Sequence, residues 1–317
     1  MERFGKWCAA NVGATLLLVG SIGALVYFFG FFYCFRNGDE TTALWASRAW
    51  NSENNQEHSW FVLPIAFYLL WHHREKMRKA RKEPCDLGLV WLLGGVLLFI
   101  AGVRMIDART AVVSFPVIIY GSALFLWGRE VARVFVFPCL FMLFMVPVGG
   151  FVQGTVSLQV LVSQCVEVLS VLIGVRVEVV GTTLRAPGYF NFDIAEGCSG
   201  IRSLMAMVTL SALYVHFTQR ETWKQWVIFA GSIVFALIGN VGRVFSVVVV
   251  ARFINEKLAG GIYHDYSGFV FFPVAVGAML GFAKLLNTDW RAVAADAVKP
   301  ERPNPGRKTR GPISYDY

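Results

Sequence analysis

Eight predominantly apolar stretches, separated by short polar segments, follow one another along the chain. They cover residues 12–35, 60–72, 87–103, 111–128, 134–148, 200–217, 226–250 and 266–286. A helix of about 20 apolar residues crosses the roughly 30 Å hydrocarbon core of a membrane, and most of these stretches fall in or near that length. The pattern therefore predicts an all-α polytopic membrane protein with about eight transmembrane helices.

Residues 1–286 are expected to form a single multi-spanning domain, because the apolar stretches follow one another with only short connections. The first stretch is too long for an ordinary signal peptide, so we interpret it as an uncleaved span. Residues 287–317 hold four prolines and many charges. This composition predicts a disordered cytoplasmic tail.

Two segments between the fifth and sixth stretches have a different pattern. In residues 151–173, polar side chains recur at helical spacing among valines and leucines, which predicts an amphipathic helix at the membrane interface or lining the bundle interior. In residues 175–197, apolar and polar residues alternate around glycine and proline turns, which predicts a small hairpin. An open hairpin cannot lie in lipid, where its edge amides would stay unpaired, so we expect it outside the membrane.

Composition agrees with the membrane interpretation. The chain is 56% hydrophobic and only 16% charged, whereas soluble proteins carry about 25% charged residues. The net charge of +8 does not indicate nucleic-acid binding, because the basic residues cluster in short loops between apolar stretches. The six cysteines form no CxxC pair, so the sequence supports neither a disulfide framework nor a zinc site, and no cofactor is expected.

The distribution of lysine and arginine predicts the topology. With a cytoplasmic N-terminus, the inner segments carry 18 of these residues and the outer segments carry 8. The positive-inside rule is then satisfied with both termini in the cytoplasm. On this topology Cys198 lies at the outer end of its span, Arg243 lies in the outer third of the next span, and His264 precedes the last one.

These three residue types could together catalyse acyl transfer. A cation or a helix N-terminus lowers the pKa of a thiol such as Cys198, and the thiolate can then attack a carbonyl. His264 would transfer protons, and Arg243 would stabilise an oxyanion. Each residue also has a simpler interpretation: a packed cysteine, a solvated histidine, or an arginine that snorkels to the interface. Asn240 lies three residues before Arg243 on the same helical face, which favours a function for that arginine.

Four sequence segments resemble motifs of the exosortase/archaeosortase family. The run from Ala195 to Leu204 resembles the cysteine motif of the family, although a glycine separates Glu196 from Cys198 where the family more commonly has Glu-Cys. Asn240-Val241-Gly242-Arg243 resembles Asn-x-x-Arg, and His264-Asp265-Tyr266-Ser267-Gly268 resembles His-x-x-x-Gly. The segment from His58 to Pro64 looks like the family's SHG-x-L-x-P segment, with an imperfect match around the histidine.

The resemblance implies a membrane-embedded, sortase-like cysteine transpeptidase. Such enzymes cleave C-terminal sorting signals of the PEP-CTERM type, which consist of a short motif, one transmembrane helix and a basic tail. Cys198 would be the nucleophile, Arg243 the transition-state stabiliser and His264 the acid and base. The supporting candidates are Ser199, Arg202, Asn240, Glu196 and His58.

The resemblance also implies where the protein works and with which partners. The enzyme would sit in the cell inner membrane with its site on the outer side. Its partners would be exported proteins with a sorting signal, membrane lipids, and water, a lipid or a glycan as acceptor.

Two other functions remain open from the sequence. A polytopic transporter could use Arg243 as an anion site, which would predict paired internal repeats with broken helices. Alternatively, a non-enzymatic component of an envelope or exopolysaccharide assembly could carry the same motifs with an inert Cys198.

Overall fold

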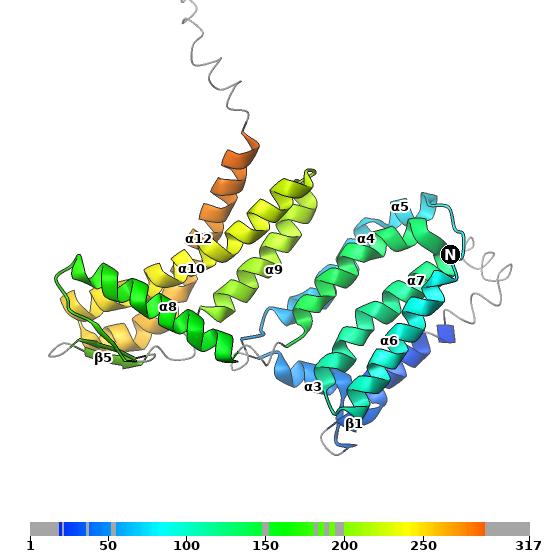
Figure 1. Cartoon of the computed structure of the whole chain (residues 1–317), viewed down its shortest axis with the longest axis horizontal. Helices are drawn as coiled ribbons and strands as arrows, with labels where there is room; N and C mark the ends of the chain where they lie inside the picture. Colours follow the sequence, from blue (N-terminus) through cyan, green and yellow to red (C-terminus); the bar gives the residue numbers. More distant parts are fainter. Residues whose placement is uncertain are drawn as a thin grey trace, which may run out of the picture.

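The computed structural model describes residues 19–20, 22–35, 38–51, 55–147, 152–180, 183–186, 190–193 and 200–288. Within these residues the fold is almost entirely helical, which confirms the predicted all-α membrane class (Figure 1). Five described helices are long and apolar enough to cross a membrane: Leu87–Arg104, Ala108–Met145, Ile201–Thr218, Thr222–Phe253 and Tyr266–Asn287. Shorter apolar helices cover Ile22–Phe31, Ser59–His72 and Ser157–Val171.

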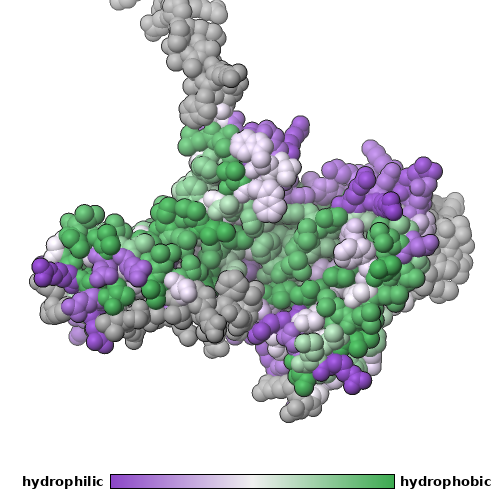
Figure 2. Space-filling view, viewed as in Figure 1, coloured by the Kyte–Doolittle hydropathy of each residue, from purple (hydrophilic) through white to green (hydrophobic). Residues whose placement is uncertain are grey.

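Apolar side chains cover much of the molecular surface, and hydrophilic residues gather toward its ends (Figure 2). Large hydrophobic side chains such as Phe67, Leu97 and Val274 are at least 60% exposed. Such a surface would be costly in water, and it is the surface that a lipid environment covers.

The first apolar stretch is not helical throughout. Its helix ends at Phe31 with the π-helical turn η1 (Tyr27–Phe31), and β1 (Tyr33–Phe35) then pairs antiparallel with β2 (Glu40–Thr41). The predicted span 12–35 was therefore wrong at its end. Phe35 is buried against Phe99 in a protein-lined cluster, and hydropathy cannot distinguish a short buried strand from a helix. Residues 12–18 lie outside the described residues.

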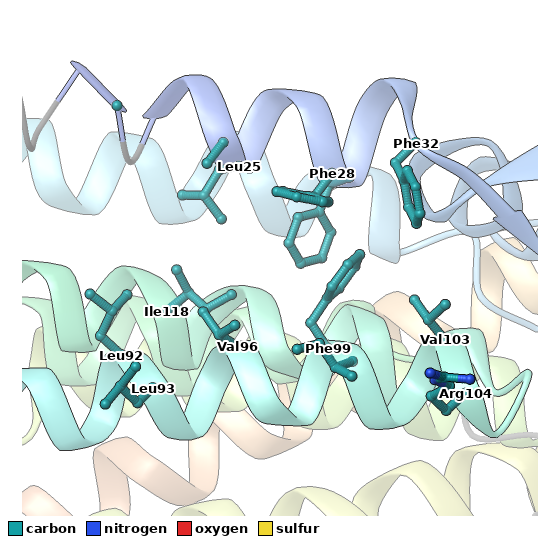
Figure 3. Close-up of a pocket in the computed structure, with 14 residues that line it drawn as sticks. Leu25, Phe28, Phe32, Leu92, Leu93, Val96, Phe99, Val103, Arg104 and Ile118 are labelled. Atoms are coloured by element: carbon teal, nitrogen blue, oxygen red, sulfur yellow. The ribbon is translucent and has the colours of Figure 1, made fainter.

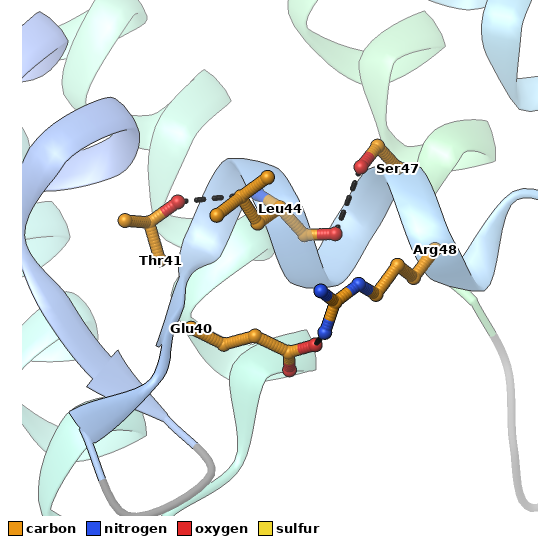
Figure 4. A network of polar contacts seen from close by, with 5 residues as sticks. All are labelled: Glu40, Thr41, Leu44, Ser47 and Arg48. Carbon is orange, nitrogen blue, oxygen red and sulfur yellow. Dashed lines mark hydrogen bonds and ion pairs between the residues drawn. The ribbon is translucent and has the colours of Figure 1, made fainter.

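A short helix, α3 (Thr42–Ala49), follows this strand pair (Figure 4). The hydroxyl of Thr41 caps it by accepting from the Leu44 amide at 3.2 Å. Glu40 forms an ion pair with Arg48 near the other end of the helix. Both contacts are local, and they fix α3 against the strand residues that precede it.

The next helices are α4 (Ser59–His72), α5 (Arg74–Lys79), α6 (Leu87–Arg104) and α7 (Ala108–Met142), followed by the 3-10 turn η3 (Leu143–Met145). Helix α6 packs closely on the first part of α7. A Cβ added at Gly95 would lie 2.7 Å from Ile118 Cγ1, and one at Gly102 would lie 2.6 Å from the Ala111 amide nitrogen. Small residues therefore permit close backbone approach, as is common between membrane helices.

Gly128 divides α7 into two limbs. Its φ of 80° interrupts the helix, and an added Cβ would overlap the Glu83 carbonyl. Val112 packs in one cluster with Met142 and Met145, although 30 residues of straight helix would separate Val112 from Met142 by about 45 Å. The limbs therefore run antiparallel and correspond to the two predicted spans 111–128 and 134–148.

The second half contains α8 (Val152–Val171), β3 (Glu178–Val180), β4 (Thr183–Ala186) and β5 (Phe190–Asp193). The strands form one antiparallel sheet in the order β3-β4-β5, so the predicted single hairpin was incomplete by one strand. The sheet lies beside α8 at the end of the molecule farthest from the first half (Figure 1). Val166 of α8 and Leu184 of β4 share a buried cluster with Val244 and Val248, so the sheet is anchored to α10 (Thr222–Phe253).

Four helical segments complete the fold: α9 (Ile201–Thr218), α10 (Thr222–Phe253), the short α11 (Glu256–Leu258) with the π-helical η6 (Ala259–Tyr263), and α12 (His264–Asn287). Two glycines and the polar residues Asn240 and Arg243 fall within residues 239–243, yet α10 is continuous there. A Cβ at Gly239 would lie only 2.8 Å from the Ala275 Cβ. The glycine therefore serves close packing of α10 on α12 and does not break the helix.

The two halves meet where α9 packs beside α4 and α7. At one end of α9, Arg202 forms an ion pair with Glu57, just before α4. At the other end, the His216 ring stacks on Phe137 with centroids 3.6 Å apart and lies 6.1 Å from His73. Helices α4 and α9 therefore run in the same direction. The predicted tail from residue 289 onward lies outside the described residues.

Candidate functional site

The N-terminus of α9 packs closely against α10 at Gly200. Gly200 precedes the helix with a left-handed φ of 73°, and an added Cβ would lie 2.6 Å from Asn240 Nδ2. The Gly200 carbonyl accepts from Ser203 Oγ and from the Leu204 amide, each at 2.8 Å. Asn240 itself is buried. Only glycine combines this backbone conformation with such close contact to a side chain.

Arg243 lies one turn after Asn240 on α10 and reaches α12. Its Nε donates to Ser267 Oγ at 3.0 Å, and its Nη2 donates to the His264 carbonyl at 3.1 Å. Ser267 is buried, and its hydroxyl donates to the same carbonyl at 3.0 Å. These three hydrogen bonds orient the guanidinium and join α10 to the first turn of α12.

The backbone around His264 is shaped to allow this contact. His264 begins α12 directly after η6, in which Gly261 leaves helical geometry with φ −105° and ψ −116°. One turn later, a Cβ at Gly268 would meet Arg243 Cζ at 3.6 Å. The His-x-x-x-Gly spacing thus places the histidine carbonyl and the glycine backbone against one guanidinium group.

A small cavity of about 30 Å³ lies between α9, α10 and α12. Ser203, Asn240, Arg243 and Gly268 contribute to its wall, and the rest is formed by small apolar and phenylalanine residues. A cavity of this size holds about one water molecule. Polar groups from three helices therefore converge at one point next to the head of α9.

The segment before α4 approaches the same end of α9. Arg202 Nε lies 3.3 Å from Glu57 Oε2, and both side chains are about half exposed. Burial lowers the pKa of the adjacent His58, an effect that a hydrogen bond with the Phe144 backbone and the nearby Glu57 charge partly oppose. A neutral His58 imidazole is thus favoured.

The structure brings together most of the predicted site residues that it describes. On α10 and α12, the residues Asn240, Arg243 and His264 lie next to one another. Arg202 lies on the adjoining first turn of α9 and pairs with Glu57, and His58 is the residue after Glu57. The other three predicted residues, Glu196, Cys198 and Ser199, lie outside the described residues, so their roles stay predictions. In sequence, Cys198 precedes Gly200 by two positions.

Sequence reasoning missed Ser267, Ser203 and Glu57. Ser267 falls inside the His264–Gly268 motif, so its spacing from His264 was an available signal. Nothing in the local sequence indicated that Glu57 would meet Arg202, because the two are separated by most of the first half. In the part of the chain that the structure describes, no three His, Cys, Asp or Glu residues are grouped so as to hold a metal ion.

Replacing Gly200 with alanine is expected to destabilise the protein. A left-handed conformation costs a non-glycine residue about 1–2 kcal/mol, and the new methyl group would also displace Asn240. The expected result is a fall of several degrees in the thermal unfolding midpoint of the detergent-purified protein. The control is Gly277→Ala, since a Cβ there meets nothing within 4 Å. Equal midpoints for the two variants would contradict the packing described here.

A family model described as "Transmembrane exosortase (Exosortase_EpsH)" matches residues 50–281. The matched range runs from just before α4 into α12 and contains every residue of the site described above. No curated protein and no solved structure matches the chain.

Proposed function

Because this match covers most of the chain, the protein belongs to the transmembrane exosortase family of sortase-like membrane enzymes, and on that premise we propose that it is a cysteine transpeptidase. It cleaves the C-terminal sorting signals of exported proteins at the outer face of the inner membrane. The observation that carries this proposal is the hydrogen-bonded position of Arg243 beside the head of the helix that follows Cys198.

The proposed reaction begins with the Cys198 thiolate. Its sulfur attacks the carbonyl carbon of the scissile peptide, an S–C bond forms, and the carbonyl oxygen becomes an oxyanion. Arg243 stabilises this charge. When the intermediate collapses, the C–N bond breaks and the His264 imidazolium protonates the leaving amine. A thioester remains on Cys198 until water or an acceptor nucleophile attacks its carbonyl carbon, gives its proton to the now neutral His264 imidazole and displaces the Cys198 thiolate.

The geometry of Arg243 supports this role. A stabilising group is most effective when it is already oriented before the charge develops, so that no reorganisation is needed in the transition state. Two of the Arg243 nitrogens donate to Ser267 and to the His264 carbonyl. The same contact holds the backbone of His264 beside Arg243 and thus keeps the acid–base residue near the stabilising cation.

The proposed topology is supported by the placement of charge along the bundle. The site lies at the end of α9 that meets Glu57, and the opposite end meets His73, which directly precedes the basic run from Arg74 to Lys82. Under the positive-inside rule this run is cytoplasmic and the site faces outward. A substrate helix with a basic cytoplasmic tail would present its motif at the same outer level.

This function is preferred over the two alternatives. Family membership supports an enzyme over a transporter with an anion site at Arg243. It also disfavours a non-enzymatic assembly component. The acceptor in the second step is proposed to be water, a lipid or a glycan.

Deleting the gene in its native host tests the proposal. Exported proteins that end in a short motif, one transmembrane helix and a basic tail are expected to keep this C-terminal segment in the deletion strain and to lose it in the parent. Mass spectrometry of C-terminal peptides measures the difference, and re-expression of the intact gene provides the control. Identical C-termini in both strains would contradict the proposed function.

A further inference from the structure

A long apolar groove lies between the first helix and α6, far along the sequence from the proposed catalytic residues (Figure 3). Its volume is about 630 Å³, within the range of small-molecule binding sites. Leu25 and Phe28 line one side, and Leu93, Val96 and Phe99 line the other. The walls are almost entirely hydrocarbon, so the groove suits an apolar chain.

The length of the groove matches one leaflet of a membrane. Its lining includes residues of the first helix and the adjacent Gly20 and Phe32, and on α6 it extends from Leu92 to Arg104. These twelve residues of α6 rise about 18 Å, whereas half of the hydrocarbon core is about 15 Å thick. A fatty acyl chain running parallel to the helices would therefore fill the groove along most of its length.

One end of the groove carries a positive charge. Arg104 is the last residue of α6 and one of the residues lining the groove, and its side chain is exposed. Within the described residues no carboxylate forms an ion pair with it. A single guanidinium at the end of a hydrocarbon groove matches an anionic headgroup attached to an acyl chain.

We propose that this groove binds one anionic phospholipid, with an acyl chain along α6 and the phosphodiester at Arg104. On the proposed topology the lipid belongs to the outer leaflet. Phe28 and Phe29 both pack against Phe99, with ring centroids 5.9 and 4.9 Å apart, so aromatic contacts join the two walls of the groove. The bound lipid fills the space between the first helix and α6 and so stabilises their association. This inference is independent of the catalytic proposal.

Lipid titration of the delipidated, detergent-purified full chain tests the site. Native mass spectrometry is expected to show one tightly bound phosphatidylglycerol and a much weaker phosphatidylcholine with the same acyl chains. Arg104→Gln is expected to weaken phosphatidylglycerol binding about tenfold, since a charged hydrogen bond is lost. The control is Arg109→Gln, which removes an equal charge from the first turn of α7 without lining the groove, and it should bind like the parent.

A second pair of variants tests the hydrocarbon part of the site. Val96→Trp should fill the groove and abolish the tight binding of phosphatidylglycerol. Leu97→Trp, at a neighbouring exposed position outside the lining, should preserve this binding. The proposal is overturned if both lipids bind equally, because the contact would then be ordinary boundary lipid. It is also overturned if Arg109→Gln weakens binding as much as Arg104→Gln, or if both tryptophan variants bind like the parent.

Discussion

Cys198→Ala is expected to reduce processing of C-terminal sorting signals below detection. Alanine cannot form the thioester, and loss of the nucleophile in enzymes that use covalent catalysis costs on the order of a thousandfold or more. Cys198→Ser should be nearly as impaired, because a hydroxyl is far less acidic than a thiol and the site is adapted to a thiolate. The measurement is the ratio of cleaved to intact substrate in cells that express each variant at equal levels.

The control for this experiment is Cys165→Ala. Cys165 is exposed on α8 and should be dispensable. An additional assay isolates the nucleophile: hydroxylamine, which cleaves thioesters, should release substrate from the parent enzyme and none from Cys198→Ala. If Cys198→Ala retained processing at the parental rate, the cysteine mechanism would be wrong and the non-enzymatic interpretation would gain support.

Arg243→Lys is expected to lower kcat by about 10²–10³-fold, the usual cost of removing one oxyanion donor, with little change in KM. Lysine keeps the positive charge but cannot donate simultaneously to Ser267 and the His264 carbonyl in the planar arrangement of arginine. The quantity to measure is the single-turnover rate of cleavage, because it separates the chemical step from substrate binding.

The matched control is Arg252→Lys, which makes the same exchange near the end of α10 and should leave the rate unchanged. Ser267→Ala adds a graded test, because it removes the acceptor for Nε and keeps the cation. We expect it to be slower than the parent and faster than Arg243→Lys. Equal kcat for Arg243→Lys and the parent would show that Arg243 does not act in the transition state.

The hydropathy pattern identified the membrane class and most helices because lipid selects for length and composition along the local sequence. It failed where the chain is covered by protein. The strand ending at Phe35 is buried against Phe99. The deciding contact there comes from a segment that is distant in sequence, so no local pattern contains it.

Some of the site residues could be found from the sequence, and others could be found only from the structure. The motifs containing Asn240, Arg243 and His264 could be found in the sequence because their residue types and spacing are unusual inside apolar stretches. Glu57 could not be connected to Arg202, since their pairing depends on how α4 and α9 lie side by side. Cys198 was identified by its position at the start of a span and by its motif, and its role stays a prediction.

The sequence by itself determined that this is a helical membrane protein, which segments are apolar enough to span, and which reactive residues stand out. The tertiary structure decided that the two limbs of α7 are joined at Gly128 without a loop, that the sheet directly before α9 has three strands and not two, and that Arg243 is held by Ser267 and the His264 carbonyl. The physical reason is the range of the interactions. Transfer of a segment into lipid depends on its own side chains, whereas hydrogen bonds and close helix packing depend on which faces of distant helices meet.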